Sequence, residues 1–153
     1  METLLIEFIK ILGSFILGSI CGYEYKSWRE RSAKIKEEKK EALNKLRAEL
    51  KTFTINWRTF RISEKSYLNP ALKDIQDKLA STSNLLRRIV SEKEKLLPKE
   101  IIGDAITISS ELEKLSRKQF FIDGGKSLRE FLEAGDKLVE RCEKLILEID
   151  KLS

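Results

Sequence analysis

The sequence predicts an all-α protein in which one N-terminal transmembrane helix continues into an antiparallel bundle of about four helices. Only two prolines and seven glycines interrupt 153 residues, and strand-favouring residues are not grouped into alternating runs. Apolar residues instead recur at intervals of three and four, which places them on one stripe of a helix. We divide the chain into a transmembrane helix (residues 1–23), a charged helical stalk (24–45) and a cytoplasmic helical bundle (46–153).

The first 23 residues are long and apolar enough to suggest a membrane span. At about 1.5 Å per residue they extend about 34 Å, against a hydrocarbon core of about 30 Å. Glu7 and Lys10 interrupt the apolar run in its first half, where they can pair at i, i+3 and Lys10 can reach the outer interface. A cleaved signal peptide or a lipoprotein signal fits less well, because a basic n-region is lacking and Ile20 precedes Cys21. A helix lying in the membrane interface is a further alternative, because the two charges shorten the apolar run.

The residues that flank this segment predict its orientation. No basic residue precedes it, whereas seven follow it closely: Lys26, Arg29, Arg31, Lys34, Lys36, Lys39 and Lys40. The positive-inside rule then places the C-terminal domain in the cytoplasm and the N-terminus outside. Aromatic residues are typical of such an interface. We therefore expect the following residues to mark the cytoplasmic boundary of the bilayer: Tyr23, Tyr25, Lys26, Trp28, Arg29 and Arg31.

Small and polar residues form one stripe of the membrane segment, which we call the association stripe. Its members share one sector of about 120° on a helical wheel: Glu7, Lys10, Ser14, Gly18 and Gly22. The small-xxx-small spacing of Ser14, Gly18 and Gly22 allows two helix backbones to approach closely. We therefore predict a homo-oligomer formed through this stripe, with Glu7 and Lys10 pairing between subunits. The frequent use of glycine in membrane helices is the plainer explanation, and a water-lined pore is a third interpretation.

Beyond the membrane segment, the apolar pattern predicts the stalk and the first helix of the bundle. Neither Pro nor Gly occurs between Tyr23 and Ile62, so the helix should continue as a solvated stalk with i, i+4 pairs such as Glu41 with Lys45. Contact of the stalk with anionic lipid is the alternative. A packed helical seam follows, with apolar residues at intervals of four and three: Leu46, Leu50, Phe53, Trp57 and Phe60.

Three further helices should complete the bundle, separated by residues that break helices. Asn69 is a good N-cap and Pro70 suits a first helical position. Pro98 marks the next turn, because the residue before a proline disfavours the α region. The glycines of FFIDGG mark the last turn, and Ser127 with Glu130 forms a capping box for the final helix. Short connections of this kind favour antiparallel neighbours.

The sequence lacks the patterns that carry catalysis, so we predict a protein that is not an enzyme and needs neither cofactor nor metal. It has no histidine, the commonest metal ligand and general base near neutral pH. Gly125, Lys126 and Ser127 match the end of a phosphate-binding loop, but Phe120 stands where the first glycine belongs. A turn between two helices explains these residues better. Cys142 falls on an apolar stripe and is expected in the core.

Basic residues interleaved with aromatic ones occur in proteins that bind nucleic acid, but we do not expect nucleic acid to be a partner of this chain. Arg58 and Arg61 flank Trp57 and Phe60, but these aromatics fall on the apolar seam and are better explained as core. Two further basic pairs are expected on solvated faces, with an anion clamp as the alternative: Arg87 with Arg88, and Arg117 with Lys118.

The predicted function is that of a membrane-tethered scaffold, adaptor or regulator. Its partners would be the lipid bilayer, further copies of itself and an unknown cytoplasmic protein bound by the bundle, whose local concentration the tether raises. The alternative is a small pore-forming or membrane-perturbing effector, of toxin or defence type, that is gated by its bundle.

Overall fold

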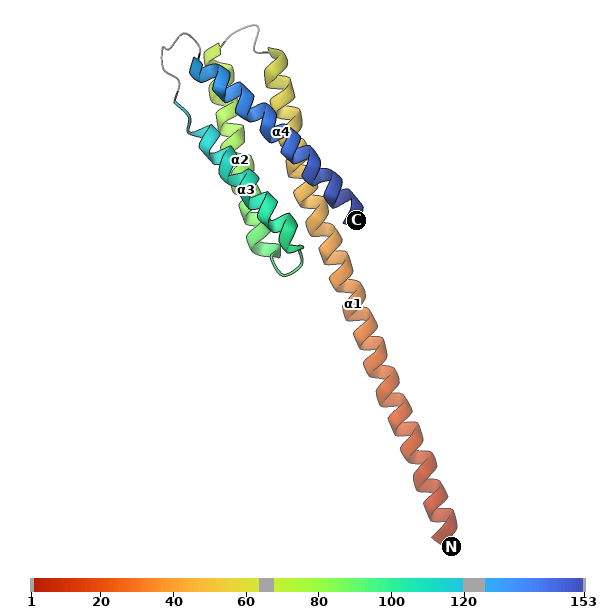
Figure 1. The fold of residues 1–153 in the computed structure, drawn as a ribbon. Helices are drawn as coiled ribbons and strands as arrows, with labels where there is room; N and C mark the ends of the chain where they lie inside the picture. Colours follow the sequence, from red (N-terminus) through yellow and green to blue (C-terminus); the bar gives the residue numbers. More distant parts are fainter. Residues whose placement is uncertain (1, 64–67, 120–125, 153) are drawn as a thin grey trace. The chain divides into compact units, whose positions relative to one another are not determined.

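The computed structural model describes residues 2–63, 68–119 and 126–152, and their side chains except those of residues 2–21, 63 and 68–70. These residues form four helices, α1 (Glu2–Ser63), α2 (Leu68–Lys93), α3 (Lys99–Ser116) and α4 (Lys126–Leu152) (Figure 1). The described residues contain no strand. The predicted all-α class and the predicted number of helices are therefore confirmed.

The chain divides into two compact units, Met1–Glu38 and Lys39–Ser153. The first unit is helical from Glu2 onward and contains the predicted transmembrane segment, residues 1–23. Across the residues with described side chains, no helix is long and apolar enough to cross a membrane. Side chains 1–21 of the predicted segment lie outside that set, so the membrane span gains no support from the structure and stays a prediction.

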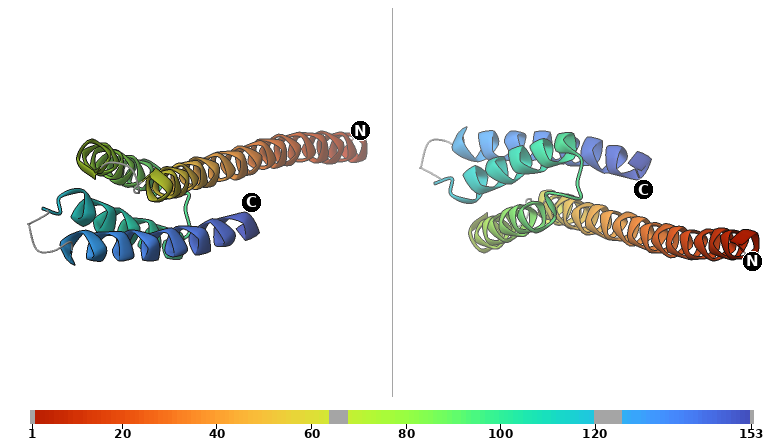
Figure 2. Two further views of the ribbon diagram at one scale, coloured as in Figure 1. Left: turned by 90° about the horizontal axis from the view of Figure 1, so that it is seen from above. Right: turned by 90° about the horizontal axis from the view of Figure 1, so that it is seen from below.

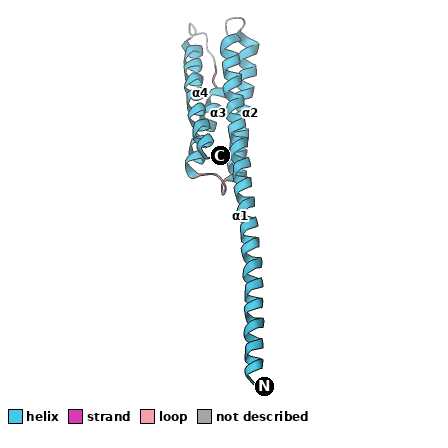
Figure 3. Cartoon of the chain, turned by 90° about the vertical axis from the view of Figure 1, so that its right-hand side faces the viewer, coloured by secondary structure: helices cyan, strands magenta, loops and turns pink. Residues whose placement is uncertain are grey.

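The second unit is an antiparallel bundle formed by α1 from Lys39 onward together with α2, α3 and α4 (Figures 1 and 2). Side-chain pairs between helices fix the directions, because residue numbers rise along one helix while they fall along its neighbour. Between α1 and α4 these pairs are Arg47 with Asp150, Arg58 with Glu143, and Arg61 with Asp136. For α2 and α3, the hydrogen bonds from the Gln76 side chain to the carbonyl oxygen of Lys118, just beyond α3, and from Ser83 to Ser109 show the same. Figure 3 shows the four helices of this bundle from the side.

The core of the bundle follows the apolar stripes of its helices. Leu46, Leu50 and Trp57 of the predicted seam are at most 1% exposed, and the rest of the seam is also buried. The seam is therefore confirmed. Ala42 and Leu43 are fully buried as well, so the core begins one helical turn before residue 46, where we expected the bundle to start. Charged residues surround these two positions, and for that reason the sequence pattern assigned them to the stalk.

The turns between the helices lie close to the predicted positions. Pro98 is the N-cap of α3, in an extended conformation, which confirms the turn predicted there. Helix α2 begins at Leu68 and so includes Asn69 and Pro70, because a proline in the first turn lacks only an N–H that would be unpaired anyway. Ser127 is the second residue of α4 rather than its N-cap.

The last turn, residues 120–125, lies outside the described residues. The element that precedes it is helix α3, whereas a phosphate-binding loop follows a strand. The carboxylate of Glu130, the second member of the expected capping box, accepts a hydrogen bond from Lys118 Nζ at 3.1 Å. The described elements on either side of these residues are thus both helices, α3 and α4.

An aromatic cluster holds α1 against α4. The ring centroid of Trp57 lies 5.3 Å from that of Phe131 and 5.4 Å from that of Phe60. The Trp57 indole donates a hydrogen bond from Nε1 to Asp136 Oδ1 at 2.8 Å. A Cβ atom placed on Gly135 would lie only 1.9 Å from Trp57 Cζ2, so the indole occupies the space that a side chain would need. The packing of the Trp57 indole against α4 therefore depends on a glycine at this position.

A second close contact joins α2 and α3 through two buried serines. The Ser83 hydroxyl donates to the Ser109 carbonyl oxygen at 2.8 Å, and the Ser109 hydroxyl donates to the Ser83 carbonyl oxygen at 3.1 Å. Both side chains are at most 1% exposed. Because serine is small and each hydroxyl has an acceptor, the two backbones approach closely without an unpaired buried group.

Candidate functional site

The residues predicted to mark the bilayer boundary lie on the exposed surface of α1. Tyr23, Tyr25 and Trp28 are 77%, 64% and 65% exposed, and the ring centroids of Tyr25 and Trp28 are 6.3 Å apart. Exposed aromatic rings of this size are unusual on a surface that meets only water. Their amphipathic rings suit the polar boundary of a membrane, where one end is apolar and the other wet.

Basic side chains accompany these rings. Lys26, Arg29 and Arg31 are exposed, and none of them has an ion-pair partner among the residues that the structure describes. Their positive charge is thus available to an external anionic surface. Gly22, the last residue of the association stripe, is also exposed, and a Cβ atom there would meet nothing within 4 Å. The side chains of Glu7, Lys10, Ser14 and Gly18 lie outside the described residues.

Sequence reasoning missed an apolar residue within the stalk. Ile35 is 55% exposed and lies seven residues after Trp28, two helical turns further along α1. Ser32 lies between them and is half-buried. The many charged residues of the segment obscured the apolar pattern. In the sequence, Ser32 lies four residues after Trp28, and Ile35 lies three residues after Ser32.

The basic residues considered for nucleic-acid or anion binding lie next to carboxylates of neighbouring turns or helices. Arg58 pairs with Glu143, and Arg61 Nη2 lies 3.2 Å from Asp136 Oδ2. The residues considered for an anion clamp are also paired: Arg87 and Arg117 with Glu113, Arg88 with Glu92, and Lys118 with Glu130. An external anion would have to compete with these carboxylates, so the anion-clamp alternative gains nothing from the structure.

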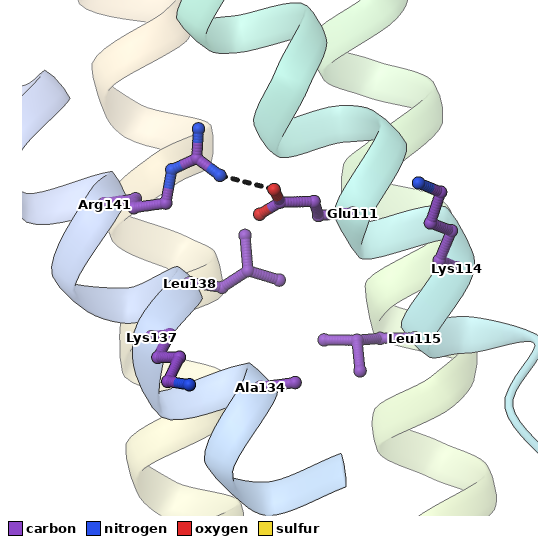
Figure 4. Close-up of a pocket in the computed structure, with 7 residues that line it drawn as sticks. All are labelled: Glu111, Lys114, Leu115, Ala134, Lys137, Leu138 and Arg141. Atoms are coloured by element: carbon purple, nitrogen blue, oxygen red, sulfur yellow. Dashed lines mark hydrogen bonds and ion pairs between the residues drawn. The ribbon is translucent and has the colours of Figure 1, made fainter. Parts of the chain in front are cut away.

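A cleft of about 380 Å³ opens between α3 and α4 (Figure 4). Leu115, Ala134 and Leu138 form its apolar floor, and Figure 4 shows the Glu111–Arg141 ion pair closing one end. Two lysines complete the lining: Lys114 and Lys137. Such a lining can receive a small apolar group, but it holds no pair of groups arranged for acid–base or nucleophilic chemistry.

A broader apolar surface follows the outer groove between α1 and α4. Two depressions of about 470 Å³ and 380 Å³ lie along it, and Arg58 lines both. Ile55, Ile62 and Leu147 border these depressions and are 63%, 80% and 61% exposed. Large exposed apolar side chains are therefore concentrated along this groove.

Cys142 was expected in the core and is fully buried there. Burial raises the pKa of its thiol to about 12, so it stays protonated near neutral pH and is a poor nucleophile. Within the described part of the chain, no cluster of three or more acidic, cysteine or histidine side chains could hold a metal ion.

The buried thiol predicts how the stability of the bundle depends on alkaline pH. The unfolded chain ionises Cys142 above its ordinary pKa of 9.0, whereas the folded chain does so only near 12, so stability is complete below pH 9 and falls above it. Relative to a Cys142→Ala variant, the free energy of unfolding should fall by about 2 kcal/mol between pH 8 and pH 10.5. Urea unfolding of both proteins at the two pH values measures this, and parallel pH profiles would contradict it.

Comparison with protein-family models, with curated proteins and with solved structures finds no match to this chain.

Proposed function

We propose that this chain is a membrane-anchored interaction protein without enzymatic activity. In this proposal, residues 1–23 cross the bilayer once, with the N-terminus outside, and the bundle binds a protein partner in the cytoplasm. The observation that carries the proposal is the exposed set of Tyr23, Tyr25 and Trp28 with Lys26, Arg29 and Arg31, directly after the apolar segment. Aromatic rings and unpaired cations at this position suit the headgroup region of a cytoplasmic leaflet.

Self-association through the association stripe is part of the same proposal. A helix that serves only as an anchor needs neither Glu7 and Lys10 nor small residues in register with them. Charged residues within a membrane segment are costly, and pairing between subunits would offset that cost. Small residues at four-residue intervals, as in Ser14, Gly18 and Gly22, favour close helix–helix contact in lipid.

The partner would bind in the outer groove between α1 and α4. Ile55 and Ile62 are seven residues apart on α1, so they present two apolar side chains about 10 Å apart along the helix. Leu147 of α4 lies beside Ile55 in the same depression. An amphipathic partner helix with apolar residues two turns apart matches this spacing. Tethering would keep such a partner at high local concentration near the membrane.

Membrane insertion and orientation are tested together by cysteine labelling in a Cys21→Ser background. We expect the full chain to stay in the membrane fraction after alkaline carbonate extraction. A membrane-impermeant maleimide should label Thr3→Cys in intact cells, and should label Lys151→Cys only after permeabilisation, because Lys151 is an exposed residue of the cytoplasmic bundle. Cys142 is fully buried and should not react.

Carbonate extraction and the two cysteine variants distinguish a transmembrane helix from an interfacial one and test the orientation. Release of the protein by carbonate would contradict a transmembrane helix and favour one that lies in the interface. Equal labelling of Thr3→Cys and Lys151→Cys in intact cells would contradict the predicted orientation while leaving membrane attachment in place.

A further inference from the structure

Between Tyr25 and Ile35, α1 carries three large apolar or aromatic side chains that are exposed. Tyr25, Trp28 and Ile35 are 64%, 65% and 55% exposed, and Ser32 is half-buried. The intervals of three, four and three residues place these four side chains on one stripe of the helix, which we call the stalk stripe. They correspond to the a and d positions of two successive heptads, the positions that form the contact in a coiled coil.

Charged residues border the stalk stripe on both sides. The flanking positions hold Glu24, Arg29, Arg31 and Lys36, all of them exposed. A helix that lies on a membrane surface needs a wide apolar face, whereas an a/d-only stripe is the narrow seam of a coiled coil. Ile35 lies about 10 Å along the helix beyond Trp28, which the proposed function places at the headgroup level. Lipid therefore covers at most the first part of the stripe, and another helix is the better cover for the whole of it.

The spacing of the stalk stripe continues in the sequence on both sides. Toward the N-terminus, the same intervals of three and four lead through Cys21 to Gly18 and Ser14 of the association stripe. Toward the C-terminus, they lead through Lys39 to Ala42, where the buried seam of the bundle begins. A contact through Ser14, Gly18 and Cys21, which follow intervals of four and three, would therefore extend without a change of register into the stalk stripe.

We infer that the stalk stripe packs against the same stripe of a second copy of this chain, as a short parallel two-stranded coiled coil. The inference rests on the proposed membrane anchoring, since two copies inserted in one orientation are necessarily parallel. Tyr25 and Ser32 occupy the a positions of this contact, and Trp28 and Ile35 occupy the d positions. Ile35, which lies beyond the headgroup level, would thereby be buried between two stalks.

Flanking charges make this contact weak unless the two chains are already held together. In a parallel pair, Glu24 faces Arg29 of the second copy, which is attractive, but Arg31 faces Lys36 of the second copy, which is repulsive. Ser32 adds a polar residue at an a position. The stalks should thus associate only where the membrane raises their effective concentration. The same arrangement identifies Arg31 as a position where reversing the charge strengthens the pair.

Two serines of the stalk provide a matched crosslinking test in the full chain, with Cys21→Ser and in native membranes. Ser32→Cys lies on the stripe, whereas Ser27→Cys lies at an outward c position five residues away. With a short bis-maleimide, we expect a several-fold higher yield of crosslinked dimer for Ser32→Cys than for Ser27→Cys. Buried Cys142 should not contribute. Equal yields for the two variants would overturn the inference.

Two charge-reversal variants test the register of the stalk contact in the same experiment. Arg31→Glu should raise the crosslinking yield of Ser32→Cys, because glutamate would face Lys36 of the second copy. Lys34→Glu makes the same change of charge at an outward c position and should leave the yield unchanged. A yield that rises equally for both variants would show a general effect of net charge and would overturn the assigned register.

Native Cys21 separates a failure of this inference from a failure of the proposed function. If Cys21 of the unmodified chain crosslinks in membranes but Ser32→Cys does not exceed Ser27→Cys, the proposed self-association stands and the stalk contact is overturned. If neither Cys21 nor Ser32→Cys crosslinks, both are overturned. If only Ser32→Cys crosslinks above its control, the stalk contact stands, and the predicted contact of the membrane segment is wrong.

Discussion

Gly135→Ala is expected to destabilise the bundle by about 1–3 kcal/mol, the usual cost of overpacking a core. An added Cβ atom would lie 1.9 Å from Trp57 Cζ2, far inside van der Waals contact. The indole has little room to move, because it packs against Phe60 and Phe131 and its Nε1 is bound to Asp136. This steric cost should outweigh the gain of about 1 kcal/mol that alanine normally brings to a helix interior. Urea unfolding followed by far-ultraviolet circular dichroism measures the difference.

Gly103→Ala is the matched control for this substitution. Gly103 is exposed within α3, and a Cβ atom there would meet nothing within 4 Å. The same change should therefore stabilise the bundle by up to about 1 kcal/mol. In a Trp57→Leu background the cost of Gly135→Ala should also shrink, since the clashing ring is gone. Stabilisation by both glycine substitutions in the otherwise unchanged chain would show that α1 and α4 are not packed as closely as described.

Phe131→Ala is expected to cost about 3–5 kcal/mol, which is the range measured when a large aromatic side chain is removed from a core. Phe131 is fully buried, and its ring lies against those of Trp57 and Phe60 at centroid distances of 5.3 Å and 6.4 Å. Small domains are stable by only about 5–15 kcal/mol, so this loss takes a large share of the total. We expect a marked fall in the unfolding midpoint at unchanged denaturant dependence.

Leu147→Ala removes an apolar side chain from the same helix at little expected cost. Leu147 is 61% exposed in the outer groove, so the free energy of unfolding should change by no more than about 0.5 kcal/mol. Comparable losses for Phe131→Ala and Leu147→Ala would mean that the groove is part of the core rather than a free surface. A large difference between them leaves the groove as an exposed apolar surface that contributes little to folding.

Local sequence patterns were sufficient to predict the helices and most of the core. The seam from Leu46 to Phe60 repeats at four and three residues, and helix geometry converts that repeat directly into a buried stripe. Pro98 likewise marks its turn through restrictions on its own backbone and on the residue before it. Gly135 also falls on a stripe of its helix, but its contact with Trp57 was not predictable. That contact depends on which helix lies opposite and at what height.

Contacts between residues that are distant in the sequence could not be predicted either, because they also depend on which helix lies opposite. Arg58 meets Glu143, and Arg61 meets Asp136, because α1 and α4 are neighbours in one particular alignment. No local rule connects these positions. In the stalk, Trp28 and Ile35 are seven residues apart, but the many charged residues around them obscured this spacing; the structure shows both side chains exposed on α1. The predicted membrane segment rests on composition and flanking charge alone.

The ion pairs between α1 and α4 act mainly against misalignment. They are partly exposed, and pairs of this kind each contribute little to the free energy of folding. Apolar stripes by themselves, however, allow one helix to slide by a turn, because similar apolar side chains recur at that spacing. Such a slip would move Arg58 from Glu143 to Val139 or Leu147 and would take Asp136 away from both Arg61 and the Trp57 indole. The surface charges thus act together with the fit of the Trp57 indole against Gly135, which a slip would also lose, to select one alignment of α1 and α4.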